Sequence, residues 1–349
     1  MLGIGSTLII RFMGIRIEDV AQATHVSTAT VSRALRNLPG VGPTTKKRIL
    51  ETAEALGYIP SPTAASLASG HTHSIGLVQP DMSRWFFGKI LESAENTFRK
   101  AGYDALVYSL PDYLGPVRQR FNANVLRGKI DALVVLSLFF DPSEEEQLRS
   151  LKVPVVFVSV EQPGFNYVGI NDEETAARAC RHLITLGHKH IGHLSGQTND
   201  KCPVAPTQRR RNGWHNTMQR FHLDSSDDLV EAVTIMTASN GYIATQRLLD
   251  RRPDITAILA SSDEMAMGAI QAIKERGLRV GHDISVMGID GHDLSPSFGL
   301  ATMAQPVSQE GTKAAQLALA SITNQTEPKT IVLPTTLVEG PSIGPAPTS

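Results

Sequence analysis

Three residues, Thr28, Ala29 and Arg33, have the types and the spacing with which a helix can read DNA bases. At 100° per residue they fall within about 140° of one another on one side of a helix. The two short side chains allow a close approach to the bases, and the arginine can bond guanine O6 and N7 together. We interpret them as a candidate base-reading surface. The alternative is an ordinary helical hairpin of a globular core.

Two short helices joined by a tight turn would position this surface. A turn follows the first helix at His25, and Ser27 is placed to cap the second helix by accepting the N–H of Thr30. In the second helix Val31 and Leu35 lie four residues apart and are expected to face inward. The first helix carries an apolar row at i, i+3, i+4 and i+7, formed by Ile17, Val20, Ala21 and Thr24.

A third helix is predicted from Pro43, a residue suited to a first helical position, to Leu56, with Gly57 ending it. The three helices would close a small domain over residues 15–60. We expect residues 1–14 to be an extension without fixed structure, with Met13 as the functional start. The inner stripe of the third helix is predicted to be Ile49, Leu50, Ala53 and Leu56.

A hinge is predicted over residues 61–73, after the two prolines Pro60 and Pro62 force an extended path. Residues 63–69 are too short and too polar to form a stable helix alone. They are either a plain linker or a segment that folds only on DNA. In the second case Leu67 would be an apolar wedge in the minor groove.

From Ser74 onward, strand-like and helix-like stretches alternate every 23 to 35 residues. This pattern predicts parallel sheet covered by helices on both faces, with ligands at the carboxyl ends of the strands. Residues 344–349 are expected to be a tail without fixed structure. Strands are predicted to begin near Ile75, Ala105, Ala132, Val155, Ile191, Thr256 and Ser285, and helices to cover 86–101, 115–127, 173–186, 207–221, 238–251 and 264–276.

Composition excludes several classes of protein. With 41% hydrophobic and 19% charged residues the chain can bury a core and is not a disordered protein. Residues 1–73 hold seven basic and four acidic residues, a charge of +3, against −4 for the rest, which agrees with a nucleic-acid-binding head. Two cysteines suit a reducing cytoplasm. No apolar stretch reaches the length of about 18 residues that a membrane helix needs, and we see no convincing signal peptide.

Seven motifs in order resemble those of the LacI/GalR family of bacterial transcription regulators, over nearly the whole chain. The head contributes V-S-T-A-T-V-S-R-A-L, and A-L-G-Y-I-P followed seven residues later by Leu67. The body contributes G-Y-D-A-L, V-P-V-V-F-V, H-L-I-T-L-G-H-K-H-I-G-H-L-S-G, A-I-L-A-S-S-D-E-M-A-M-G-A and D-I-S-V-M-G-I-D. The resemblance implies an all-α helix-turn-helix head joined by a hinge to an α/β, two-lobed domain like the type I periplasmic binding proteins.

The resemblance also implies roles for individual residues. The body would be an effector-binding domain over 74–343, with one lobe at about 74–168 and 302–330 and the other at about 169–301 and 331–343. Thr28, Ala29 and Arg33 resemble base contacts, and Leu67 the hinge leucine. DNA backbone contacts would come from Ser27, Thr30, Ser32, Arg36 and Thr45. The effector would lie between the lobes, against Phe86, Phe87, Arg210, Ser262, Asp263 and Asp290. The alternative for the aromatic pair is core packing at the start of a helix, and the alternative for Arg210 is a surface ion pair.

This sequence departs from the family at several of these places. His25 stands where the family has a glycine with left-handed backbone, and histidine tolerates that conformation better than most residues. Ser262-Asp263 replaces Asn-Asp, and Arg84-Trp85 replaces Asn-Pro before the aromatic pair. Arg84 and Arg210 together would favour an anionic sugar.

The sequence therefore predicts a cytoplasmic, ligand-responsive transcriptional repressor that binds a pseudo-palindromic operator in double-stranded DNA as a homodimer. Its effector would be a carbohydrate. A sugar-binding protein of a transport system is the alternative; it would need export and no recognition helix. An enzyme is not expected, since no nucleophile motif, phosphate-binding loop or metal-ligand cluster stands out. We expect no catalytic residue, metal, cofactor or membrane partner.

Overall fold

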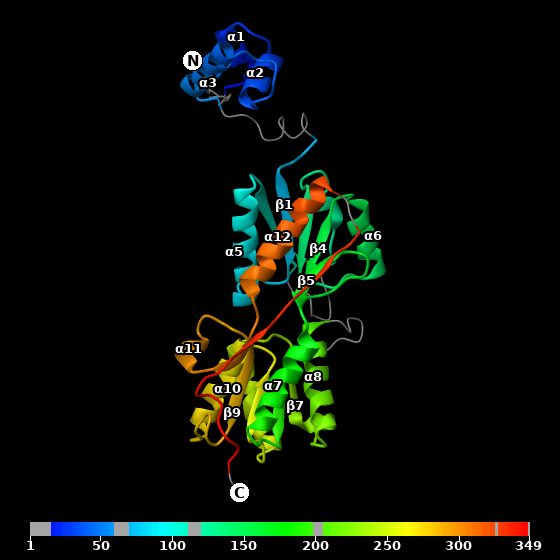
Figure 1. Cartoon of the computed structure of the whole chain (residues 1–349), viewed down its shortest axis with the longest axis vertical. Coiled ribbons are helices and arrows are strands. Elements are labelled where there is room, and N and C mark those ends of the chain that lie inside the picture. Colours follow the sequence, from blue (N-terminus) through cyan, green and yellow to red (C-terminus); the bar gives the residue numbers. More distant parts are fainter. Residues whose placement is uncertain (1–14, 59–69, 111–119, 198–204, 325–326, 348–349) are drawn as a thin grey trace, which may run out of the picture. The chain divides into compact units, whose positions relative to one another are not determined.

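The computed structural model describes residues 15–58, 70–110, 120–197, 205–324 and 327–347. The chain divides into two compact units between Thr72 and His73. The first unit is the helical head and the second is the two-lobed α/β body (Figure 1). This is the fold class that the sequence predicted. The predicted extension at 1–14 and most of the predicted hinge lie outside the described residues.

The head consists of α1 (Ile17–Thr24), α2 (Thr28–Leu35) and α3 (Pro43–Leu56). His25 ends α1 with φ 50° and ψ 42°, so the predicted left-handed turn residue is confirmed. Gly57 ends α3 in the same conformation, with φ 69°. The core of the head is made of Val20, Ala21, Val31, Ala34, Ile49 and Ala53.

The predicted inner stripe of α3 is only half right. Ile49 and Ala53 are buried, whereas Leu50 is 41% exposed and Leu56 is 37% exposed. Two short helices cover only a narrow row of α3, at i and i+4. Leu50 lies about 100° around the helix from Ile49 and so falls outside that row.

The body contains two six-stranded sheets, each with neighbouring strands parallel except where β12 joins the second sheet antiparallel to β10. The first sheet has the order β11 (Thr330–Leu333), β5 (Asn166–Ile170), β4 (Val155–Val158), β3 (Ala132–Leu136), β1 (Ser74–Gln79), β2 (Asp104–Ser109). The second has the order β12 (Thr336–Val338), β10 (Ala301–Ala304), β9 (Ser285–Asp290), β8 (Ala257–Ala260), β6 (Ile191–Gly196), β7 (Val230–Val233).

Helices cover both sheets. On the first sheet, Ile75 and Leu77 of β1 pack with α5 (Trp85–Lys100) and α12 (Val307–Thr323). Val78 packs on the other face with α6 (Pro142–Ser150). In the second lobe α7 (Asp172–Thr185) packs on α8 (Pro206–Arg220), and α9 (Ala238–Arg251) packs on α10 (Asp263–Glu275). The remaining short elements are η1 (Ala123–Val125), η2 (Asp227–Leu229) and α11 (Ser295–Phe298).

The chain passes between the lobes a few residues later than the sequence predicted. β5 runs unbroken through 168 and 169 in the first sheet, and Asn171 then caps α7. β10 pairs with β9 in the second sheet although most of it falls in the predicted first lobe, and β11 pairs with β5 although most of it falls in the predicted second lobe. Hydrogen bonding to neighbouring strands decides to which sheet these residues belong, and the sequence pattern does not mark those partners.

Two further predictions need correction. The predicted helix at 115–127 is, in its described part, a single 3₁₀ turn, because Asn122 caps a short turn and the N–H of Phe121 is held by Glu144 on α6.

The tail is ordered up to residue 347. The N–H of Ala346 donates to the carbonyl of Leu186, and the N–H of Gly344 donates to the hydroxyl oxygen of Ser285. No described helix has the length and the apolar character to cross a membrane.

Candidate functional sites

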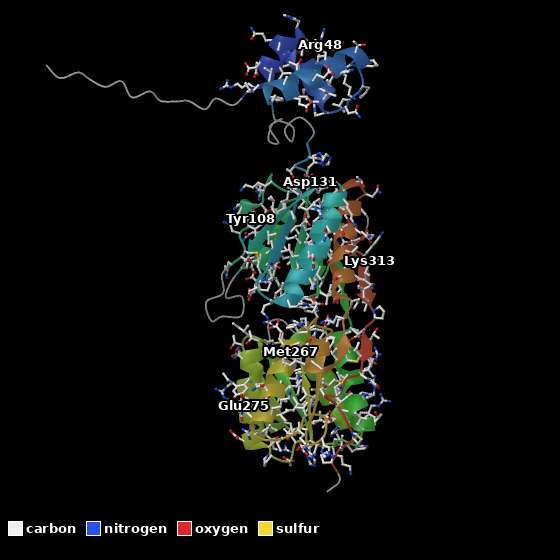
Figure 2. The ribbon with its side chains drawn as sticks, turned by 90° about the vertical axis from the view of Figure 1, so that its left-hand side faces the viewer. Arg48, Tyr108, Asp131, Met267, Glu275 and Lys313 are labelled. Carbon is white, nitrogen blue, oxygen red and sulfur yellow. The ribbon has the colours of Figure 1, made fainter. Side chains whose placement is uncertain are left out.

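The exposed side of α2 in the head is the first candidate site. Thr28, Ala29 and Arg33, the predicted base contacts, are all exposed (Figure 2 shows the side chains of the head). A guanidinium nitrogen of Arg33 lies 3.1 Å from the position that a Cβ of Gly40 would take, and Gly40 has φ +99°. A side chain at residue 40 would therefore crowd the arginine, and glycine leaves it room.

The N-terminus of α2 is held by Ser27. Its Oγ accepts the N–H of Thr30 at 3.1 Å, as the sequence predicted, and lies 2.9 Å from the hydroxyl of Thr30. Arg36 is exposed and its Nε donates to the carbonyl of Ser32 at 3.2 Å. Thr45, in the first turn of α3, is half-buried. Each predicted backbone-contact residue is thus in a described helix or at its cap. Leu67, the predicted wedge, lies outside the described residues.

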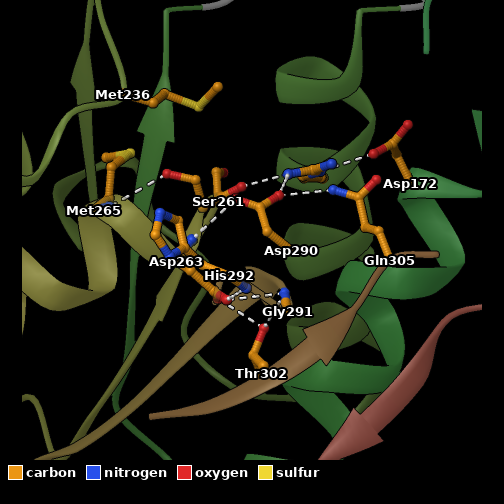
Figure 3. A network of polar contacts seen from close by, with 12 residues as sticks. Asp172, Met236, Ser261, Asp263, Met265, Asp290, Gly291, His292, Thr302 and Gln305 are labelled. Carbon is orange, nitrogen blue, oxygen red and sulfur yellow. Dashed lines mark hydrogen bonds and ion pairs between the residues drawn. The ribbon is translucent and has the colours of Figure 1, made fainter. Parts of the chain in front are cut away.

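A buried polar cluster at the carboxyl end of the second sheet is the second candidate site (Figure 3). Arg210 on α8 is 6% exposed, so it is not a surface ion pair. Its Nε donates to Asp172 at 2.8 Å, and its Nη1 donates to the carbonyl of Ser261 at 2.5 Å and lies 3.7 Å from Asp290. Burial lowers the pKa of Arg210, but the carboxylates of Asp172 and Asp290 outweigh it, and the net shift is upward.

Asp290, the last residue of β9, is held in an unusual conformation. Its φ is +152°, a value that residues other than glycine rarely adopt and that tends to occur at functional sites. Its carboxylate accepts from Gln305 at 2.7 Å and from the N–H of Asp263 at 3.2 Å. Burial raises the pKa of Asp290, Arg210 opposes this, and the nearby Asp263 adds to it. The predicted pair Arg210 and Asp290 is therefore brought together.

Ser262 and Asp263, which the sequence placed on the effector, have protein partners. The hydroxyl of Ser262 caps α10 by accepting the N–H of Met265 at 3.3 Å. One carboxylate oxygen of Asp263 accepts from the N–H groups of Gly291 and His292 and from Ser295, at 2.8 to 2.9 Å, and the other accepts from Thr302 at 2.7 Å. With these oxygens committed, Asp263 holds the loop after β9 in place.

Phe86 and Phe87 lie at the start of α5 and are half-buried against the core of the first lobe. Their ring centroids are 5.5 Å apart, edge to face. They therefore pack in part against the core of the first lobe, as residues at the start of a helix commonly do.

The residues before this aromatic pair connect the two lobes. Arg84 bonds Glu264 at 3.0 Å and the carbonyl of Met236. Trp85 donates to Asp293 at 3.1 Å and stacks on His292 with ring centroids 4.6 Å apart. The guanidinium groups of Arg84 and Arg210 are both neutralised by protein carboxylates, which argues against the anionic sugar that the sequence favoured.

Sequence reasoning missed two buried polar residues, Gln79 and Glu310. Gln79 ends the apolar strand β1, and Glu310 occupies the position between Val307 and Ala314 on the apolar row of α12, at spacings of three and four. A charged residue at a core position of a helix was a usable signal. Among the described residues no group of His, Cys, Asp or Glu is placed to hold a metal ion.

Comparisons with known proteins agree with both units. Residues 16–61 match the family described as bacterial regulatory proteins, lacI family, and residues 180–343 match the periplasmic binding protein-like domain. Catabolite control protein A of Priestia megaterium is 31% identical over 324 residues, 92% of this chain and 96% of that protein. The transcriptional regulator MalR of Clostridium butyricum is 30% identical over 331 residues, covering 93% and 97%. The solved lac repressor dimer bound to operator and the anti-inducer ONPF has a TM-score of 0.81 and 25% identity, covering 94% of this chain and 98% of that one.

Proposed function

Because the chain belongs to the LacI family of bacterial regulatory proteins, we propose that it is a ligand-responsive transcriptional repressor that binds a pseudo-palindromic operator as a homodimer. The observation that carries the proposal is the exposed side of α2. It presents two small side chains and Arg33 next to a capped helix N-terminus. Two such helices in a symmetric dimer would enter successive major grooves about 34 Å apart.

The DNA contacts divide into two kinds. Thr28, Ala29 and Arg33 would contact base edges, and Ser27, Thr30, Ser32, Arg36 and Thr45 would contact the phosphate backbone. Backbone contacts set position and give affinity, whereas base contacts give sequence preference. The segment around Leu67 would complete the complex in the minor groove.

The effector would bind between the lobes, near Arg210 and Asp290. A guanidinium beside a carboxylate can bracket vicinal hydroxyls, and Phe86 and Phe87 would cover an apolar face of the ligand, as aromatic side chains do in carbohydrate sites. The position at the carboxyl ends of parallel strands supports this, because ligands of such sheets bind there. We propose a carbohydrate or carbohydrate derivative, no cofactor, no catalysis, and a cytoplasmic location.

Selection from a randomised duplex library, followed by fluorescence anisotropy on the selected site, tests the DNA-binding proposal. Arg33→Ala should weaken binding by about 1–3 kcal/mol and relax the preference at one base pair of each half-site. Arg48→Ala is the matched control, because Arg48 is exposed on α3 and its loss removes the same charge from the head (Figure 2). Equal loss on every duplex would make Arg33 a phosphate contact, and selection of no duplex would refute the regulator assignment.

Coupling between the two sites is tested by calorimetry. If ligand and operator act on one equilibrium, operator DNA must change the affinity for the ligand by the same factor as the ligand changes the affinity for the operator. Identical ligand affinities with and without operator would remove the claim that the protein is ligand-responsive. Sugar binding without any DNA binding would instead favour a transport protein. Sedimentation should give twice the chain mass of 37.7 kDa for the homodimer.

A further inference from the structure

Two long polar side chains in the first lobe are buried without a hydrogen-bond partner among the described residues. They are Gln79, 1% exposed, and Glu310, 0% exposed; both polar atoms of each side chain are unpaired. An unpaired buried amide or carboxylate is costly, and native proteins rarely keep one without a reason. A missing partner supplied from outside the chain is such a reason.

The side chains of Gln79 and Glu310 lie in the layer between the first sheet and the helices α5 and α12. Side chains alternate along a strand, so Gln79 lies on the same face of β1 as Ile75 and Leu77. That face packs against α5 and α12, and Val307 at the start of α12 belongs to the same core. Gln79 ends β1, and Glu310 lies in the first turn of α12. Both therefore occupy the carboxyl end of the first sheet, where ligands of parallel sheets bind.

The backbone that carries Glu310 has little freedom. A Cβ added to the next residue, Gly311, would lie 2.1 Å from the hydroxyl oxygen of Ser93 and 2.5 Å from the carbonyl oxygen of Ile90. The glycine thus lets α12 lie directly against α5. Since this contact fixes the first turn of α12, the burial of Glu310 is built into the packing of the lobe.

Glu310 lies among other carboxyl groups. Its pKa is raised to about 8, first by burial; Asp172 and Asp290 contribute in the same direction, and Arg210 opposes them. Arg210 is already bonded to Asp172 at 2.8 Å and lies 3.7 Å from Asp290. One guanidinium is therefore shared by three carboxyl groups, and Glu310 is the one that has no hydrogen-bond partner among the described residues.

The pKa of Tyr167 on β5 is affected by the same carboxyl groups. The pKa of Tyr167 is raised, first by its burial and then by Asp172; Glu310 and Glu161 contribute in the same direction and Arg209 opposes them. Tyr167 donates to the carbonyl of Ser159 at 3.5 Å. With its pKa at about 8, Glu310 holds a proton at neutral pH and is uncharged while the site is empty. A bound cation beside it would let Glu310 ionise, whereas a bound anion would not.

We propose that the effector of this chain carries a protonated primary amine, as an amino sugar does, and that Glu310 accepts its N–H groups with the amide oxygen of Gln79 as a second acceptor. Glu310 is then a residue that determines ligand class. The inference rests on the proposed function in one respect, namely that a small ligand binds between the lobes. On binding, the ammonium group replaces the proton of Glu310, and that proton is released to the solvent.

Isothermal titration calorimetry with matched sugars tests the inference. Glucosamine, galactosamine and mannosamine are compared with glucose, galactose and mannose. At least one amine should bind the wild-type protein tighter than its neutral parent by about tenfold or more, the effect of one charge-assisted hydrogen bond. Titrations at pH 7 in two buffers of different ionisation enthalpy should show proton release. Glu310→Gln should lose most of the preference and the proton release, while Glu146→Gln, at an exposed carboxylate on α6, should keep both.

Several outcomes would overturn the inference: no binding by any amine, equally tight binding by the neutral parents, or a preference that survives in Glu310→Gln. If Glu310→Gln does not fold, Glu310→Leu provides the same comparison, because it also removes the charge. The same preparations are tested on the selected DNA. DNA binding without an amine preference removes only this inference, whereas an amine preference without DNA binding removes the regulator assignment and leaves the inference standing.

Discussion

Replacing Glu310 by glutamine should make the stability of the body less dependent on pH. In the folded protein the pKa of Glu310 is raised from 4.5 to about 8, chiefly by burial. A carboxyl group with a raised pKa binds its proton more tightly in the folded state than in the unfolded chain. The wild-type protein therefore loses stability as the pH rises from about 4.5 to about 8, and glutamine, which does not titrate, loses none on this account.

The size of the effect follows from the two pKa values. One pKa unit corresponds to about 1.4 kcal/mol, so the full difference between 4.5 and about 8 is worth about 5 kcal/mol. Applying the linkage relation between pH 5.5 and pH 8.5 gives about 3 kcal/mol of that total. Asp290 has a raised pKa as well. Because it is present in both proteins, it cancels to first order in the difference between variant and wild type.

Urea denaturation followed by tryptophan fluorescence measures this difference. The two tryptophans, Trp85 and Trp214, are both in the body, so the signal does not report on the head. The unfolding free energy of Glu310→Gln minus that of the wild type should increase by about 3 kcal/mol from pH 5.5 to pH 8.5. Glu146→Gln, at an exposed carboxylate, should change by less than about 0.5 kcal/mol. A constant difference for Glu310→Gln, or one that falls with pH, would refute the reasoning.

Three other substitutions test the packing described above. Ser27→Ala removes the cap of α2 and should cost about 1 kcal/mol, seen as faster hydrogen exchange of the α2 amides and no change in the tryptophan transition. Ile49→Ala should cost the head about 2–5 kcal/mol, seen as lost protection in all three head helices; unchanged protection would contradict the assigned core. Asp263→Asn places an NH₂ group against donors and should cost the body about 2–4 kcal/mol. It is measured by the urea midpoint, and a variant as stable as the wild type would mean that these hydrogen bonds contribute little.

Local chemistry made the head largely predictable. The cap at Ser27, the left-handed turn at His25 and the glycine after α3 each depend on a few neighbouring residues, and each is found as expected. The exposure of Leu50 and Leu56 was not predictable in this way. It depends on how many helices reach α3, and that is a property of the whole unit.

The body was predictable where strand and helix patterns are strong. The helix at 238–251 was predicted to the residue. Two helices of the body, α6 and α12, were missed. α6, with the sequence P-S-E-E-E-Q-L-R-S, buries only Glu144 and Leu148 and has almost no apolar row. α12 was missed although it has an apolar row, which Glu310 interrupts. The meeting of Arg210 and Asp290 could be anticipated only from the family resemblance, because they come from a helix and a strand 80 positions apart.

Side-chain partners were the least predictable feature. Nothing in the sequence around Asp263 shows that its oxygens are taken up by the loop after β9, since Gly291 and Thr302 are brought to it only by the order of strands in the sheet. The same is true of Glu310. Its position on an apolar row is visible in the sequence, but the absence of a partner is a property of the packed lobe.

The link between β11 and β12 limits how the lobes can move. β11 ends at Leu333 in one sheet and β12 begins at Thr336 in the other, so only two residues join them. Two extended residues reach about 7 Å, and Thr335 is itself bonded to Thr175 and Arg178 on α7. Because this link is so short, the two lobes cannot separate at this edge. Any opening of the body must therefore be a hinge rotation of one lobe relative to the other about this edge.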